Sequence, residues 1–231
     1  MPWKPFVAGI ALVALAACEP VSTTQITAGP GSGPVPRATA TNFAQVVRTV
    51  EPVAERECRA RTSGQNCDFR IVIVGDANAP PNAFQTLDKN GRPIIGFTQA
   101  LIKDARNVDE LAFVMGHEAA HHIAGHISRQ QQNAVAGAVI AGSLAVLLGG
   151  TGEAVQSAQR TGARVGARTY SKDFELEADA LGTVITHRAG FNPVRGAEFF
   201  TRIPDPGDRF LGTHPPNRQR IDIVRRTASQ L

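Results

Sequence analysis

The short motif with the clearest chemical meaning in this sequence contains two histidines and one glutamate. His117, Glu118 and His121 form the pattern H-E-x-x-H. Residues i and i+4 lie on one face of a helix, so both imidazoles can reach one metal ion, and neutral imidazole nitrogen is a favoured ligand of zinc. Glu118 lies about 100° around the helix from His117, outside this row of ligands. It can instead take a proton from a water molecule that attacks a carbonyl carbon. The motif therefore predicts zinc-dependent hydrolysis with Glu118 as the general base.

Further along the chain, a pair of acidic side chains can complete such a site. A catalytic zinc ion usually has three protein ligands and one open position. Glu175 and Asp179 are four residues apart in a segment predicted to be helical, so Glu175 can be the third ligand and Asp179 can accept the free N–H of a ligating histidine. Glu177 points roughly 200° away from Glu175. Taken alone, the cluster also fits a solvated acidic helix face. His122 and His126 fall outside the ligand row and are expected at the surface or behind the ligands.

The metal ligands need a helix that holds them in register. Asn107 is a favourable N-cap residue, Glu110 stands at the N3 position of a capping box, and apolar residues then recur at helical spacing. We therefore predict a helix that begins after Asn107 and carries the H-E-x-x-H motif. Apolar runs predict strands, and apolar periodicity predicts further helices. The strands are expected at residues 69–74 and 92–97, and the helices near 43–54, 99–106, 172–188, 195–200 and 220–224. The expected fold class is α+β, mainly helical, with a small sheet beside the active-site helix.

The N-terminal residues are typical of export rather than of a folded domain. Residues 1–17 contain Lys4 and an apolar run over 6–17, which predicts a signal peptide. The sequence Leu-Ala-Ala-Cys that ends at Cys18 resembles a bacterial lipobox, and this resemblance implies lipidation of Cys18. An ordinary secretory signal is the alternative. Because Glu19 follows in place of Asp, the resemblance favours the outer membrane, facing the periplasm. Residues 18–40 are then a lipidated cysteine and a flexible tether, and residues 41–231 are the folded domain.

Two cysteines remain once Cys18 is assigned to a lipid anchor. Cys58 and Cys67 form an even pair, and an oxidising periplasm allows them to form a disulfide. Two buried free thiols are the alternative interpretation. The pairing fits an exported protein.

Composition argues against one class of partner and leaves one segment open. The formal net charge is +4, with one Trp and one Tyr. No dense basic run interleaved with aromatic residues is present, so nucleic-acid binding is not expected.

Residues 134–148 are apolar except for Ser143. A helix of this length spans about 22 Å, which is too short to cross a bilayer. We expect a buried helix or a lid; the alternative is a segment that dips into a membrane or grips an apolar substrate.

Several segments, in order along the chain, together resemble one family of metallopeptidases, the family that includes HtpX, the prenyl (CAAX) endopeptidase and the periplasmic protease BepA. The resemblance rests on residues 82–84 (Asn-Ala-Phe), 109–121, 175–182, and His214-Pro215 with Arg220-Ile221. It implies a zincin-like (gluzincin) domain that holds one zinc ion. It also implies that substrate binds in extended form along an edge strand near the motif helix.

The same resemblance implies roles for individual residues. His117, His121 and Glu175 bind zinc, Glu118 is the base, and Asp179 supports a ligand. His214 either donates a hydrogen bond to the oxyanion of the tetrahedral intermediate or occupies the open zinc position and holds the enzyme off. A surface turn histidine is the alternative for His214.

The predicted function is that of a zinc metalloendopeptidase that hydrolyses peptide bonds in misfolded or damaged envelope proteins. The expected partners are protein substrates and a membrane, reached through the lipid anchor. A non-catalytic periplasmic chaperone or adaptor that keeps a zinc site is the alternative. A structural zinc ion is usually enclosed by four protein ligands and needs no adjacent base. The presence of Glu118 therefore favours the enzyme.

Overall fold

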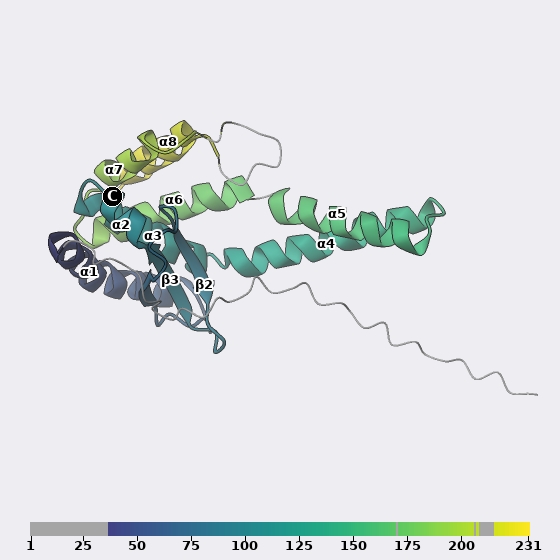
Figure 1. Ribbon diagram of the computed structural model, residues 1–231, viewed down its shortest axis with the longest axis horizontal. Coiled ribbons are helices and arrows are strands. Elements are labelled where there is room, and N and C mark those ends of the chain that lie inside the picture. The colour runs from purple at the N-terminus through teal and green to yellow at the C-terminus, as the bar shows by residue number, and fades with distance from the viewer. Residues whose placement is uncertain (1–36, 170, 206, 208–214) are drawn as a thin grey trace, which may run out of the picture.

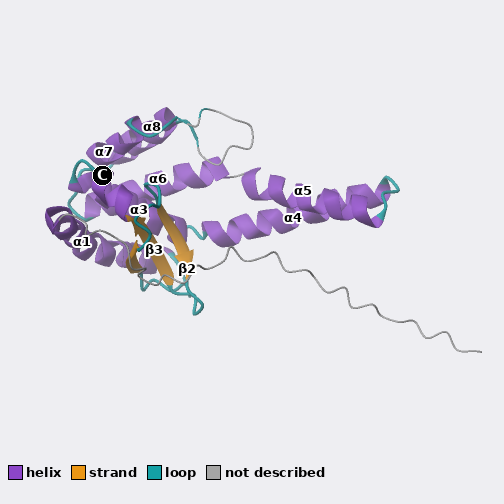
Figure 2. Ribbon diagram, in the orientation of Figure 1, coloured by secondary structure: helices purple, strands orange, loops and turns teal. Residues whose placement is uncertain are grey.

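The computed structural model describes residues 37–169, 171–205, 207 and 215–231. In this part of the chain, helices pack around a small three-stranded sheet, and a long helical hairpin extends away from them (Figures 1 and 2). The predicted mainly helical α+β class is confirmed. Cys18 and His214 lie outside the described residues. None of the described helices is long and apolar enough to cross a membrane.

The elements follow one another closely along the chain. They are α1 (Arg37–Arg61), β1 (Arg70–Val74), β2 (Ala83–Leu87), β3 (Pro93–Thr98), α2 (Gln99–Asp104), α3 (Val108–Ile123), α4 (His126–Leu147), α5 (Gly152–Thr169), α6 (Ser171–Arg188), α7 (Pro193–Gly196), the 3-10 helix η1 (Ala197–Thr201) and α8 (Asn217–Ala228). The motif helix is α3, and the helix that carries Glu175 and Asp179 is α6.

The sheet has the order β1-β3-β2, so β2 is an edge strand. β3 pairs in parallel with β1 and antiparallel with β2, and all its residues are buried. Phe84 of β2 lies opposite Gly96, and its ring crosses β3 so closely that a Cβ at Gly96 would lie 2.4 Å from a ring carbon. Only glycine permits this contact. The structure therefore adds a strand, β2, to the two predicted from the sequence.

The core joins α1, the sheet and α3. Phe43, Val46 and Val50 recur on one face of α1 and are buried, as expected from their helical spacing. The ring of Phe43 packs edge-on against Phe97 of β3 at a centroid distance of 5.0 Å. Leu111 and Met115 of α3 belong to the same buried cluster, so α1, the sheet and the motif helix share one core.

The start of α3 follows the predicted cap with one difference. The Asn107 side chain accepts a hydrogen bond from the Glu110 backbone N–H at 3.0 Å. In a capping box, the Glu110 carboxylate would accept from the Asn107 N–H. It accepts instead from the backbone N–H of Arg106 at 2.8 Å and pairs with both terminal nitrogens of Arg202 at 2.6 and 2.7 Å. The buried Glu110 thus links the start of α3 to the segment that follows η1.

Two glycines allow α3 and α6 to approach closely. A Cβ at Gly116 would lie 2.9 Å from the carbonyl oxygen of Gly182, and a Cβ at Gly182 would lie 2.9 Å from the backbone nitrogen of His117. Such contacts leave no room for any side chain larger than hydrogen. The close approach brings His117 on α3 beside the acidic side chains of α6.

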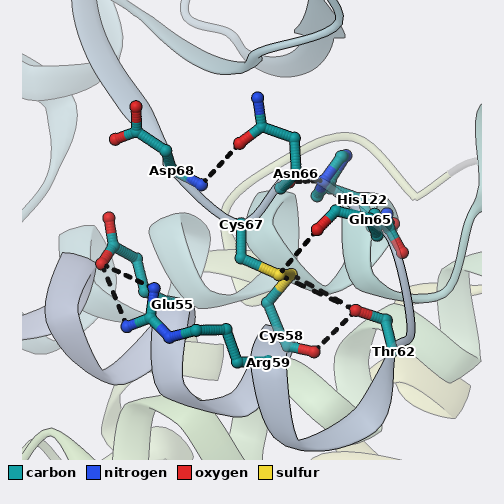
Figure 3. Close-up of a disulfide and its surroundings, with 9 residues drawn as sticks. All are labelled: Glu55, Cys58, Arg59, Thr62, Gln65, Asn66, Cys67, Asp68 and His122. Atoms are coloured by element: carbon teal, nitrogen blue, oxygen red, sulfur yellow. Dashed lines mark hydrogen bonds and ion pairs between the residues drawn. A yellow bond between two sulfur atoms is a disulfide. The ribbon is translucent and has the colours of Figure 1, made fainter.

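A disulfide fastens the end of α1 to the loop that follows it (Figure 3). Cys58 and Cys67 are joined, with a Cα–Cα distance of 5.7 Å. Next to Cys67, the backbone carbonyl of Asn66 accepts a hydrogen bond from Nε2 of His122 at 2.7 Å, and the Gln65 side chain donates to the carbonyl of His122 (Figure 3). The closed loop therefore contacts α3 one residue beyond His121.

Replacing both Cys58 and Cys67 with serine should lower the free energy of unfolding. A loop of nine residues corresponds to a loss of about 2–3 kcal/mol in the chain-entropy model. Urea unfolding of oxidised wild type and of the double variant measures the difference. A reductant should destabilise the wild type by a similar amount and leave the double variant unchanged. Equal unfolding midpoints for the two oxidised proteins would contradict this prediction.

The segment at residues 134–148 does not lie where it was expected. It forms most of α4, and α5 packs against it as the second arm of a hairpin (Figure 1). Large apolar side chains such as Ile140 and Leu147 are exposed. The expectation of a buried helix is wrong, because the partner helix α5 covers only one side of α4. The helical structure of α5 was also not predicted.

Candidate active site

Three electron-rich side-chain atoms converge between α3 and α6. Nε2 of His117 lies 3.0 Å from Nε2 of His121. The Glu175 carboxylate lies 3.6 Å from His117 Nε2 and 3.3 Å from His121 Nε2. These three residues could hold a metal ion. The i, i+4 spacing on α3 and the close approach of α6 bring them together.

The position of His117 is set by a buried ion pair behind it. Oδ1 of Asp179 lies 2.9 Å from Nδ1 of His117, and Arg220 of α8 donates two hydrogen bonds of 2.7 Å to the Asp179 carboxylate. Burial alone would raise the pKa of Asp179, but the hydrogen bonds from Arg220 and His117 outweigh it, so the pKa lies below its usual value. The ionised Asp179 accepts the Nδ1–H of His117, so in the neutral ring the lone pair lies on Nε2, which is directed at Glu175 and His121.

His121 is held by a second relay, which runs through His126. Nδ1 of His126 lies 2.8 Å from Nδ1 of His121, and its Nε2 lies 3.1 Å from the Glu177 carboxylate. Burial lowers the pKa of His126 to about 4, so its ring is neutral near pH 7. A neutral His126 that donates from Nε2 to Glu177 must accept at Nδ1. His121 then donates from its own Nδ1, so in the neutral ring Nε2 carries the lone pair. Both histidines therefore present Nε2 as a ligand.

Glycine at position 125 makes this relay possible. Gly125 lies between α3 and α4 with a φ of 66°, a left-handed conformation that residues with a Cβ rarely adopt. The turn ends α3, and α4 begins with His126, whose ring lies beside His121. The ring of His126 also stacks on Phe174 at a centroid distance of 4.6 Å. The relay is thus fixed by packing as well as by hydrogen bonds.

The donor set fits zinc in both chemistry and spacing. Two imidazole nitrogens and one carboxylate form a ligand set of a catalytic zinc site. Ligand atoms about 2.0–2.1 Å from a tetrahedral ion are about 3.3 Å apart, and the observed separations are 3.0, 3.3 and 3.6 Å. Burial alone would lower the pKa of His121, but the hydrogen bond with Glu175 and the charges of Glu118 and Glu175 outweigh it and raise that pKa. The negative charge around Nε2 of His121 therefore favours a bound cation there, either a proton or a metal ion.

Glu118 and the three converging side chains line a cleft of about 730 Å³. One wall is the edge strand β2 with the residues before it, including Asn82 and Phe84. Apolar side chains from α3 and η1, among them Phe113 and Phe200, line the cleft as well. An extended polypeptide can therefore approach the converging side chains along an unpaired strand edge.

Arg220 and Glu177 take part in the site although the sequence analysis gave them no role, whereas His126 lies behind the ligands, one of its two expected positions. Arg220 was part of a matched motif, but its bond to Asp179 joins residues 41 positions apart, which no local pattern can indicate. Its guanidinium lies 3.9 Å from the ring centroid of Phe200 and 3.4 Å from Glu175 Oε2. His126 and Glu177 support His121, whereas His122 is buried against Asn66. The position of His126, five residues after His121, was the signal in the sequence that the two rings could lie close together.

The relay predicts that His126→Ala weakens metal binding. The loss of a hydrogen-bonded partner behind a metal ligand typically reduces affinity by roughly 10–100-fold. Titration with zinc in competition with a chromophoric chelator measures the Kd. His187→Ala is a matched control, because His187 is exposed in the last turn of α6. If both variants bind zinc as tightly as the wild type, His126 does not position His121.

Comparison with known proteins gives one family. The model of Peptidase family M48 matches residues 40–228. The putative beta-barrel assembly-enhancing protease of Vibrio cholerae is 31% identical over 186 residues, which cover 71% of this chain and 38% of that protein. The beta-barrel assembly-enhancing protease of Escherichia coli is 30% identical over 181 residues, 69% of this chain and 37% of that protein. The mitochondrial metalloendopeptidase OMA1 of Saccharomyces cerevisiae is 28% identical over 165 residues, 67% of this chain and 45% of that protein.

The match to each of these relatives spans less than half of that relative's length. The family match nevertheless covers most of this chain, and it agrees with the predicted zincin-like fold, the helix pair α3 and α6 and the cluster between them that could hold a metal ion. The chain belongs to Peptidase family M48.

Proposed function

We propose that this protein is a zinc-dependent endopeptidase that holds one zinc ion per chain. The observation that carries the proposal is the convergence of His117, His121 and Glu175 at spacings that suit zinc, beside Glu118 in a cleft. In this proposal the three side chains are the metal ligands, and Asp179 and His126 orient the two imidazoles. Three protein ligands leave one position open, as catalytic zinc requires.

Glu118 carries the proton chemistry of the proposal. A zinc ion held by His117, His121 and Glu175 would supply Lewis acidity and would make water a better nucleophile near neutral pH. Glu118 takes a proton from the water that attacks the peptide carbonyl, and it then gives a proton to the departing amine. The two imidazoles and Glu175 would hold the zinc ion in the cleft. Hydrogen bonds from Arg220 keep Asp179 ionised behind His117.

The substrate is proposed to be an unfolded polypeptide segment. An extended chain can add to the edge of β2, and its backbone hydrogen bonds then depend little on sequence. The apolar side chains in the cleft, such as Phe84, Phe113 and Phe200, suit the apolar residues that misfolded or damaged proteins expose. Relatives named beta-barrel assembly-enhancing protease support a role in the quality control of envelope proteins.

The location is proposed from the N-terminal sequence. Residues 1–17 are a signal peptide, and Cys18 is lipidated. The tether predicted at residues 19–40, whose last four residues belong to α1, joins the domain at residues 41–231 to the outer membrane, facing the periplasm. Membrane fractionation tests the anchor: Cys18→Ser should move the protein to the soluble fraction. Unchanged retention would place the anchor elsewhere.

Casein digestion tests the peptidase activity. The mature protein should produce internal cleavages that mass spectrometry can map, and a chelator should stop them until zinc is added back. Intact casein in the presence of bound zinc would support the chaperone or adaptor in place of the enzyme.

The proposed role of His214 has two forms that predict opposite results for His214→Ala. As a donor to the oxyanion, His214 contributes about 10²–10³ in rate, so turnover falls while zinc is retained. As an occupant of the open zinc position, it inhibits the enzyme, so turnover rises and self-cleavage appears. Rates of casein hydrolysis and zinc content decide between the two. Wild-type turnover with unchanged zinc affinity would contradict both.

A further inference from the structure

The hairpin of α4 and α5 exposes large apolar side chains to solvent. The exposed fractions are 70% for Ile140, 83% for Leu147 and 78% for Leu148. Val135, Val139 and Leu144 of α4 are also exposed, so the apolar surface runs along the outer half of α4 to the tip. A continuous apolar surface of this kind marks an interaction site.

These side chains are not needed to hold the hairpin together. α4 and α5 meet through Gly137, Gly162 and Gly166, where an added Cβ on Gly137 or Gly162 would lie 2.1 Å from the other glycine's carbonyl oxygen. Gly162 and Gly166 form a G-x-x-x-G pattern. Helices in lipid associate through such small residues, because these let the two backbones approach closely, and the large apolar side chains can then face the hydrocarbon. The hairpin has the same division, with small residues between the helices and large apolar residues outside.

The charge of the hairpin suits an anionic surface. Arg160, Arg164 and Arg168 are exposed at i, i+4 and i+8 on α5 and therefore share one face. Between residues 126 and 169 the sequence has four arginines and a single acidic residue, Glu153. The fourth arginine, Arg129, pairs with Glu177 at the base of the hairpin. Each of the three lies two residues from Gly162 or Gly166, so their face points away from α4. They add positive charge to the hairpin, and such charge attracts it to an anionic membrane.

The apolar surface is separate from the peptide cleft. α4 contributes only its first turns to the cleft, through His126, Ile127 and Gln130. The exposed leucines lie at the other end of α4, which is 22 residues or roughly 33 Å long. In Figure 1 the tip of the hairpin is the part of the described chain farthest from the sheet. The surface is therefore placed to contact something other than the bound substrate.

We propose that the α4–α5 hairpin docks on an anionic phospholipid surface. The apolar side chains around Leu147 and Leu148 enter the boundary between headgroups and acyl chains, and the positive charge of the arginines of α5 strengthens the attraction to anionic headgroups. The hairpin lies in the interface and does not cross the membrane. This contact requires neither zinc nor lipidation of Cys18, so it goes beyond the proposed peptidase function.

Vesicle co-sedimentation tests the proposal on the chain from residue 18 onward with Cys18→Ser, which retains every described residue. Vesicles that contain phosphatidylglycerol should sediment the protein, and pure phosphatidylcholine vesicles should bind it much less. The double variant Leu147→Gln/Leu148→Gln should weaken binding by roughly tenfold or more, since two apolar side chains no longer enter the membrane. The matched control is Ile73→Gln/Leu231→Gln, which changes two exposed apolar residues outside the hairpin and should bind like the parent.

A second pair of variants tests the charges. Arg160→Gln/Arg164→Gln/Arg168→Gln should weaken binding on the order of 100-fold at low salt. Its control replaces three exposed arginines of α8, Arg218, Arg225 and Arg226, and should change binding little. Together, loss in both hairpin variants and retention in both controls supports the proposal.

Three outcomes would overturn it. The first is that the parent protein does not sediment with phosphatidylglycerol vesicles, or that the leucine variant sediments equally well. The second is that the parent protein forms a dimer in analytical ultracentrifugation, that the leucine variant is a monomer, and that the parent does not bind vesicles. The surface would then be a contact between two copies of this chain. The third is that the leucine variant loses casein turnover in an assay without lipid, while the parent does not bind vesicles. The surface would then be a binding surface for substrate.

Discussion

Casein turnover by the Glu118→Gln variant should fall by roughly 10²–10⁴-fold, while bound zinc stays at one per chain. The substitution removes the group that takes a proton from the attacking water, and it leaves His117, His121 and Glu175 in place as donors. Glutamine has nearly the same shape as glutamate, so the cleft keeps its form. Zinc content and turnover should be measured on the same preparation.

Glu153→Gln is the matched control for this prediction. Glu153 is exposed at the start of α5, outside the cleft, so its loss should leave turnover unchanged. Near-wild-type turnover of the Glu118 variant would remove Glu118 from the mechanism. A fall in turnover together with a loss of zinc would mean that Glu118 supports the metal rather than the reaction.

Glu175→Ala should remove zinc and activity together. The carboxylate is one of three converging donors, so its loss should exceed the roughly 10–100-fold reduction in affinity that is typical of partners behind the ligands. Zinc content after dialysis and the Kd for zinc measure the effect. The Asp173→Ala variant, on the same helix and exposed, should bind zinc like the wild type.

The neighbouring Glu177 distinguishes a ligand from a support. It contacts His126 and Arg129 and is not one of the three converging donors. Glu177→Ala should therefore weaken zinc binding less than Glu175→Ala does. The reverse order would show that the assignment of the third ligand on α6 is wrong.

Local patterns could predict the elements that carry the site, because helix periodicity and capping are local properties. The predicted start of α3 after Asn107 and the predicted extent of α6 agree with the structure. The i, i+4 spacing then placed His117 and His121, and separately Glu175 and Asp179, on common helix faces. The approach of α3 to α6 depends on Gly116 and Gly182, whose packing partners the spacing does not reveal.

Contacts between distant parts of the chain could not be predicted in this way. Arg220 reaches Asp179 from α8, and β2 becomes an edge strand by pairing with β3, where Gly96 accommodates Phe84. Five residues with a single bulky aromatic give no clear alternation to indicate a strand. The relay from His126 to His121 depends on the left-handed turn at Gly125, which the sequence permits but does not specify.

Residues 134–148 show why hydrophobicity alone does not predict burial. An apolar helix of this length is usually buried, and the expectation followed that rule. Here the interface between α4 and α5 uses glycine, so the large side chains are left on the outside. Gly137 of α4 and Gly162 of α5 lie in this interface. These glycines were a signal in the sequence for close helix packing, and the expectation did not use them.

Zinc titration of the metal-free protein with casein turnover recorded at each addition tests the central claim most directly. The account predicts that turnover rises in proportion to bound zinc and reaches its maximum at one zinc per chain, while the Glu118→Gln variant binds the same zinc without turnover. Turnover that does not depend on zinc would contradict the account, as would a folded wild-type protein that binds one zinc per chain and cleaves nothing.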